Sequence, residues 1–67
     1  MAHDRDYAAK RVKRLKKKLE MLLNLPFDAT FKGRPVQKQI DSTKGALRRW
    51  LRNHPGLDDA FLASITR

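Results

Sequence analysis

The sequence predicts an all-α fold, a small helical domain of two longer amphipathic helices and a short C-terminal helix. In two long segments the apolar residues recur at alternating spacings of four and three, which is typical of helices that pack against other helices. Pro26, Pro35 and Pro55 fall at the boundaries of the segments. A chain of 67 residues has room for one hydrophobic core, so we expect residues 1–67 to form a single basic helical domain.

The first helix is expected over residues 4–25. Its apolar stripe consists of Ala8, Val12, Leu15, Leu19 and Leu22. Asp4 and Asp6 precede this stripe, where the helix dipole favours negative charge, and Pro26 ends the helix.

Residues 26–34 are expected to form a connector. Phe27 and Phe31 are predicted to be apolar anchors that lie beneath the helices. A short extended piece at residues 29–32 is compatible with this connector, and Gly33 permits a tight turn.

The second helix is expected over residues 35–53, with Pro35 at its first helical position, where its missing N–H costs nothing. The apolar stripe consists of Val36, Ile40, Thr43, Leu47 and Trp50, which favours a core position for Trp50. Gly45 lowers the stability of the helix by about 1 kcal/mol relative to alanine. A break near residues 41–42, with Ser42 as an N-cap, is therefore an alternative.

The third helix is expected over residues 57–66. Leu57, Phe61 and Ile65 share one side, and Asp58 and Asp59 suit the first turn. This helix is too short to be stable alone. It either packs into the core or forms part of an oligomer interface.

The charge of the chain is strongly unbalanced. Sixteen Lys and Arg residues stand against seven Asp and Glu residues, which gives a formal net charge of +9. Such a field attracts phosphates, anionic lipid or an acidic protein surface. Seven of the nine residues from Lys10 to Lys18 are basic and none is acidic, although like charges one turn apart destabilise a helix. This pattern favours binding of a polyanion over a merely solvated face.

The cationic side chains of the first two helices are expected to project opposite the apolar stripes, because a helix turns by about 100° per residue. The predicted nucleic-acid-binding residues are Lys10, Lys13, Arg14, Lys17, Lys18, Arg34, Lys38, Arg48, Arg49 and Arg52. Lysine makes point-like phosphate contacts, so the first helix is expected to follow a nucleic-acid backbone. Arginine adds bidentate contacts of fixed geometry, so residues 48–52 are expected to recognise the shape of the ligand more specifically.

The sequence predicts no enzyme active site, no cofactor and no metal site. It contains no cysteine, and His3 and His54 lie too far apart to form a pattern of metal ligands. Ser42 and Ser64 have no base at a recognisable spacing that would activate a nucleophile. The lack of cysteine and of an apolar leader segment favours a cytoplasmic location.

Three short stretches resemble a known family. Arg34-Pro35-Val36, Ser42-Thr43-Lys44 and Leu47-Arg48-Arg49-Trp50-Leu51-Arg52 are similar to the Arg-Pro segment, the Ser-containing turn and the L-R-x-x-L-R helix of FinO/ProQ RNA-binding domains. Phe27 and Phe31 resemble an aromatic pair that often precedes the Arg-Pro segment in that family. The resemblance implies binding of structured RNA, with Arg34, Arg48 and Arg52 as the matching positions.

We therefore predict a small basic nucleic-acid-binding protein, a regulator or chaperone that contacts mainly phosphates, with RNA slightly favoured over DNA as partner. The alternative is a protein-interaction module or inhibitor that forms a helical homodimer or docks on an acidic partner protein. A membrane partner is not expected, because the apolar stripe of the first helix lacks Trp and Phe and its leucines are needed for the core.

Overall fold

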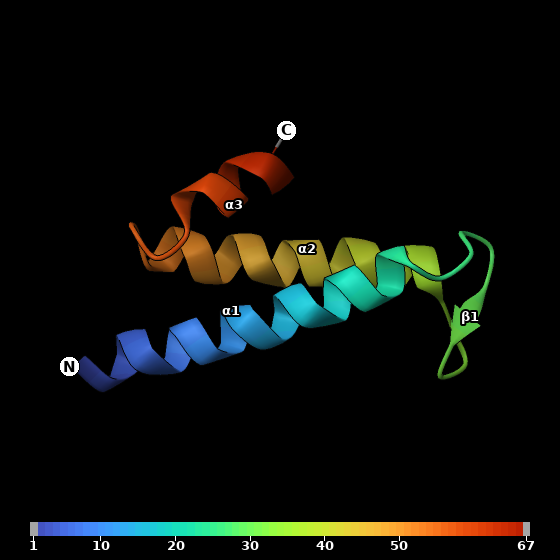
Figure 1. Cartoon of the computed structure of the whole chain (residues 1–67), viewed down its shortest axis with the longest axis horizontal. Coiled ribbons are helices and arrows are strands. Elements are labelled where there is room, and N and C mark those ends of the chain that lie inside the picture. The colour runs from blue at the N-terminus through green and yellow to red at the C-terminus, as the bar shows by residue number, and fades with distance from the viewer. Residues whose placement is uncertain (1, 67) are drawn as a thin grey trace.

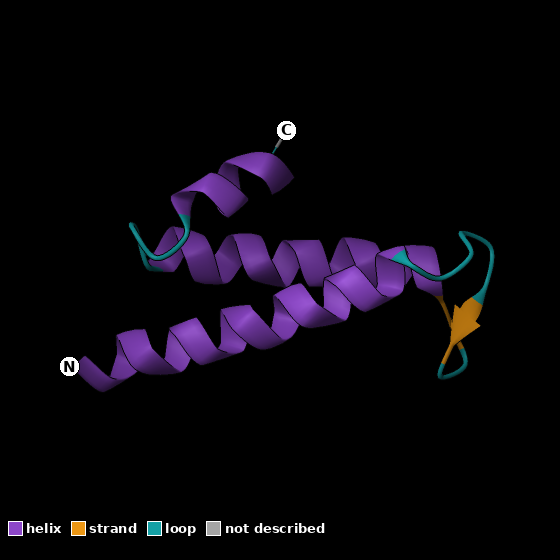
Figure 2. Ribbon diagram, viewed as in Figure 1, coloured by secondary structure: helices purple, strands orange, loops and turns teal. Residues whose placement is uncertain are grey.

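The computed structural model describes residues 2–66, with side chains from residue 4, and confirms a small all-α domain (Figure 1). The helices are α1 (Ala2–Leu23), α2 (Val36–Asn53) and α3 (Asp59–Ile65). Two-residue strands β1 (Thr30–Phe31) and β2 (Arg34–Pro35) pair antiparallel in the connector between α1 and α2 (Figure 2). α1 and α2 form an antiparallel helical hairpin, and α3 folds back against α2.

The first helix begins and ends two residues earlier than predicted. Pro26 disfavours helical backbone at the residue before it, so the last turn closes with shorter-range hydrogen bonds. The N–H of Asn24 is shared between the carbonyls of Glu20 (3.3 Å) and Met21 (3.2 Å), and that of Leu25 donates to the carbonyl of Leu22 (3.1 Å). The predicted stripe is confirmed, and its members Ala8, Val12, Leu19 and Leu22 are buried while Leu15 is half-buried.

The connector contains the predicted extended piece and the predicted turn. Lys32 and Gly33 separate the two strands with φ angles of 54° and 80°, as a type I′ hairpin turn requires. Gln39 of α2 donates from Nε2 to the carbonyl of Phe31 (2.7 Å), which holds the strand pair of β1 and β2 against α2. The prediction that Phe27 is a buried anchor is wrong, because this residue is 70% exposed while Phe31 is half-buried. The connector turns at the end of the helical hairpin, beyond the main core (Figure 1).

The second helix begins one residue later than predicted. Pro35 has an extended ψ of 132° and belongs to β2, so it precedes the first helical residue rather than occupying it. The helix runs unbroken past Ser42, and the alternative break does not occur. Packing accounts for this continuity, since Val36, Thr43, Leu47 and Leu51 are all buried on one stripe. Trp50 packs at the edge of the core and is only half-buried.

The third helix is shorter than predicted, because it begins at Asp59 and ends at Ile65. Asp58 caps it, as its Oδ1 accepts the N–H of Phe61 at 3.3 Å. Asp59 lies in the first turn as predicted, and its carboxylate accepts the N–H of Gly56, a residue of the turn that precedes the helix, at 3.0 Å. The side chains that pack half-buried against Val12, Leu19, Leu47 and Leu51 are Leu57, Phe61, Leu62 and Ile65. The third helix therefore lies on the edge of the core rather than deep within it.

Candidate nucleic-acid interface

The third helix divides the hairpin of α1 and α2 into two sides. On the side that α3 occupies, the covered side, Lys16 Nζ lies 2.8 Å from the Oδ2 of Asp58 and 4.7 Å from the centroid of the Phe61 ring. On the same side, Arg48 Nη1 donates to the carbonyl oxygen of Ile65 at 2.9 Å. Lys16 and Arg48 therefore both serve to hold α3 against the hairpin.

The hydrogen bond from Arg48 to Ile65 shows that the position predicted for Arg48 is wrong. The sequence pattern predicted that its side chain projects away from the core, whereas it is half-buried and engaged with the C-terminal end of α3. A guanidinium group at this position satisfies one of the carbonyl groups that a helix leaves unpaired at its end. Arg52 follows one turn later on the same flank of α2 and is exposed.

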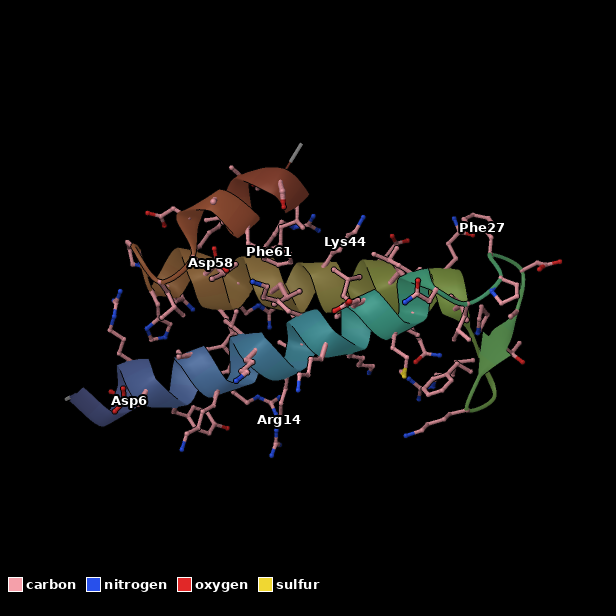
Figure 3. The ribbon with its side chains drawn as sticks, viewed as in Figure 1. Asp6, Arg14, Phe27, Lys44, Asp58 and Phe61 are labelled. Carbon is pink, nitrogen blue, oxygen red and sulfur yellow. The ribbon has the colours of Figure 1, made fainter. Side chains whose placement is uncertain are left out.

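The opposite side of the hairpin carries a group of cations. We call this side of the hairpin the open face, and its cations are Arg11 and Arg14, which line one hollow, and Lys18, Arg34 and Lys38, which line another. All are exposed except Arg11, which is half-buried, and Figure 3 shows Arg14 projecting away from α3. Arg49 is exposed on α2. In the part of the chain that the structure describes, the one salt bridge is that of Lys16 with Asp58, so no open-face cation is paired with a carboxylate.

Three of these cations converge where α1, β2 and α2 meet. Lys18, Arg34 and Lys38 line a hollow of about 450 Å³ together with Pro35, Gln39, Ser42 and Thr43. No carboxylate lines this basic hollow, and the exposed Ser42 hydroxyl in its wall can donate a further hydrogen bond. The turn at Lys32 and Gly33 brings Arg34 beside the two helices. Converging positive charge with no counter-charge attracts a phosphate group.

The outer ridge of α1 carries Lys10, Lys13 and Lys17, all of them exposed. With Tyr7, Arg11 and Arg14, these lysines line a second hollow of about 340 Å³ that also contains no carboxylate. Nine of the ten predicted residues are thus exposed. The structure brings Lys18, Arg34 and Lys38 together and separates Arg48 and Arg52 from them. The lysine ridge lies between the two sides of the hairpin, since Lys13 and Lys17 also line a hollow of about 330 Å³ with Glu20 and Asp58.

Two residues of this surface were not among those predicted. Arg11 was assigned to the edge of the apolar stripe, yet it lines the second hollow, and its buried Nε has no hydrogen-bond partner. Tyr7 is 57% exposed and lines the same hollow. Its sequence signal is helical spacing, because Arg14 and Lys18 follow Tyr7 by seven and eleven residues and so lie on one flank of α1.

The described residues 2–66 contain no cluster of three His, Cys, Asp or Glu side chains that could hold a metal ion. None of the helices in this range combines the length and the apolar character that crossing a bilayer requires. Comparison of the chain with family models, curated proteins and solved structures finds no match.

Proposed function

We propose that the protein binds nucleic acid through the open face and the adjoining lysine ridge, and that it acts as a regulator or chaperone without catalysing a reaction. The observation that carries this proposal is the convergence of Lys18, Arg34 and Lys38 on a hollow of about 450 Å³ with no carboxylate in its wall. Lysine and arginine on such a surface contact the phosphate backbone, which supplies most of the affinity and little sequence preference.

The energetics of the charged surface support a polyanionic ligand. Like charges separated by one helical turn, about 5.4 Å, are close enough to repel, because salt largely screens charges only beyond about 8 Å at physiological ionic strength. A chain with a formal charge of +9 is therefore destabilised by its own field. A bound backbone of phosphates would relieve this repulsion, and a folded protein would gain stability on binding it.

The resemblance of residues 34–52 to FinO/ProQ domains favours RNA over DNA as the ligand. Of the three arginines that the resemblance implies, Arg34 lines the basic hollow. Arg48 holds the end of α3, which leaves its guanidinium less free for a ligand. We therefore assign phosphate contact to Arg34 and a role in the fold to Arg48.

Two triple substitutions of equal charge test the proposal. The first neutralises the basic hollow with Lys18→Gln, Arg34→Gln and Lys38→Gln. The second neutralises exposed or half-buried cations outside the open face with Arg5→Gln, Lys44→Gln and Arg52→Gln; Arg5 donates to the carbonyl of Pro55, and Figure 3 shows Lys44 pointing to the covered side. Fluorescence anisotropy with labelled RNA and DNA oligonucleotides measures the affinity of each variant as salt is raised.

The hollow variant should bind much more weakly, and its log–log salt dependence should become shallower by about 0.7 to 0.9 for each phosphate that the variant no longer neutralises. The control variant should change little in slope, since its cations lie away from the ligand. Equal losses of affinity in the two variants would mean that net charge alone drives binding. No binding by the unaltered protein would contradict the proposal outright.

A protein-interaction module is the second candidate, and one observation favours it. Leu23 is 58% exposed and Phe27 is 70% exposed, both near the end of the hairpin where the connector begins. Exposed large apolar side chains often mark contact with another protein chain. Sedimentation equilibrium of the unaltered protein and of a Leu23→Ser, Phe27→Ser variant tests this candidate. A dimer that becomes a monomer in the variant would support it, and a monomer in both cases would rule out the homodimer.

A further inference from the structure

Three aromatic rings meet at the end of the hairpin where α1 begins and α2 ends. The rings of Tyr7 and Trp50 lie with centroids 5.8 Å apart at an interplanar angle of 62°. The imidazole of His54 stacks on Trp50, with centroids 6.0 Å apart and an angle of 17°. Such edge-to-face and stacked arrangements are favourable contacts between rings.

Tyr7 differs from its two partners in its surroundings. Trp50 and His54 are half-buried, and Trp50 packs against the core. Tyr7 is 57% exposed and is not among the side chains that pack on this core. Its ring lines a hollow whose other walls are the cations Lys10, Arg11, Lys13, Arg14 and Lys17. An aromatic ring that is open to water is thus set among positive charges, and no carboxylate lines the hollow that they share.

This combination is typical of surfaces that hold unpaired nucleotides. Every base has a flat face that can stack on an aromatic side chain, while the neighbouring phosphates contact lysine and arginine. A base inside a continuous duplex is already stacked on its neighbours and cannot reach the ring. We propose that the protein selects nucleic acid with unpaired bases, and that one such base stacks on Tyr7 at the edge of the Tyr7–Trp50–His54 cluster.

This inference rests on the proposed function, because the same strand would run from Tyr7 to the basic hollow. Tyr7 and Lys18 lie eleven residues apart on one flank of α1, which is about 16 Å at 1.5 Å per residue. A stacked strand covers that length with about five nucleotides at 3.4 Å each. A single strand of this length can therefore place a base on Tyr7 and a phosphate in the hollow together.

The experiment compares a single-stranded oligonucleotide, a hairpin with an unpaired loop and a blunt duplex, each as RNA and as DNA. Trp50 is the one tryptophan in the chain, so its fluorescence reports directly on the aromatic cluster. The variant Tyr7→Leu removes the ring and keeps an apolar side chain, and Tyr7→Phe is the matched control that keeps the ring. Circular dichroism verifies that each variant retains its helices.

The unaltered protein should prefer the single strand and the hairpin, and both should change the Trp50 fluorescence while the blunt duplex does not. Tyr7→Leu should lower the affinity for the single strand about tenfold and Tyr7→Phe less than about twofold, in keeping with the contribution of one stacked base. The affinity of Tyr7→Leu for the duplex should stay unchanged.

Equal affinity for duplex and single strand, or equal losses of affinity for both ligands in Tyr7→Leu, would overturn the inference and leave the proposed function intact. Absence of binding to any of the oligonucleotides would overturn both. The fluorescence of the unaltered protein decides the question even if Tyr7→Leu fails to fold, since an unchanged signal at saturation with the single strand contradicts the inference.

Discussion

Lys16 and Lys18 lie two residues apart in α1 and have different roles. Lys16 faces α3, where its ammonium group contacts both the carboxylate of Asp58 and the ring of Phe61. Lys18 faces the other side of the hairpin and lines the basic hollow with Arg34 and Lys38. The first lysine has its counter-charge within the fold, whereas the second has none in the described residues. This difference separates cations that stabilise the structure from cations available to a ligand.

The ion pair between Lys16 and Asp58 predicts how stability depends on pH. The hydrogen bond from Lys16, aided by the N–H of Phe61, holds the pKa of Asp58 below its ordinary value of 3.8. A carboxyl group whose pKa is lower in the folded state stabilises the fold above its unfolded pKa, and this contribution is lost as pH falls through the folded pKa. We expect the free energy of unfolding to fall as the pH drops below about 4.

Urea unfolding between about pH 6 and pH 2 measures this dependence. The variant Asp58→Asn should have a flatter profile, because asparagine still caps a helix but carries no charge. Asp28→Asn is a control for an exposed acid of the connector and should leave the slope as it is. Since Lys16 and Asp58 are 41% and 30% exposed, the effect should be modest. Identical profiles for Asp58→Asn and the unaltered protein would contradict this account of α3 docking.

At the scale of the elements, two glycines illustrate how backbone conformation decides stability. A methyl group added to Gly45 or to Gly33 would meet no atom within 4 Å, so neither substitution causes a clash. Gly45 lies in the interior of α2, where alanine is the better helix former. Gly33 has a φ of 80° in the turn between β1 and β2, a conformation that strains any residue with a Cβ atom.

Gly45→Ala should therefore raise the free energy of unfolding by about 1 kcal/mol. In a domain of this size the melting temperature should rise by about 4 to 8 °C. Gly33→Ala should lower the free energy of unfolding by about 1 to 2 kcal/mol. Thermal melts followed by circular dichroism measure both changes, and the opposite sign at Gly45 would indicate that α2 is not helical through this position.

Periodicity in the sequence was sufficient to predict the three helices and the apolar stripes that α1 and α2 bury. Val12 and Leu19 in α1, like Leu47 and Leu51 in α2, are spaced so that one side of each helix is apolar and packs against the other helix. This spacing involves residues close together in the chain, so it can be recognised in the sequence. The ends of the helices were predicted to within two residues, because proline and a capping carboxylate act on adjacent residues.

The side of the hairpin on which α3 packs could not be predicted from the sequence. It depends on the turn from His54 to Asp58, in which Gly56 has a φ of 86°, and on contacts between residues far apart in the chain. Because α3 packs on this side, Arg48 donates a hydrogen bond to the carbonyl of Ile65, while Lys18 stays on the open face. For the same reason the helical periodicity did not indicate which cations contact α3 and which stay on the open face. It also did not indicate that Tyr7 contacts Trp50.

At the scale of the whole molecule, α3 makes the charge distribution asymmetric. The domain measures 41 × 24 × 15 Å, so the two sides of the hairpin are separate surfaces on a thin body. The acids Asp58 and Asp59 lie with α3 on the covered side, and the open face keeps cations from α1, β2 and α2. A nucleic-acid backbone is therefore attracted to one side of the molecule. This asymmetry orients the bound ligand without any base-specific contact.

Chemical-shift mapping of the backbone amides during titration with a single-stranded RNA oligonucleotide tests this central claim most directly. We expect the largest changes at Lys18, Arg34 and Lys38 and only small changes at Lys44, Asp58 and Phe61 on the covered side. Changes that are largest along α3, or that are spread evenly over both sides of the hairpin, would contradict the assignment of the ligand to the open face.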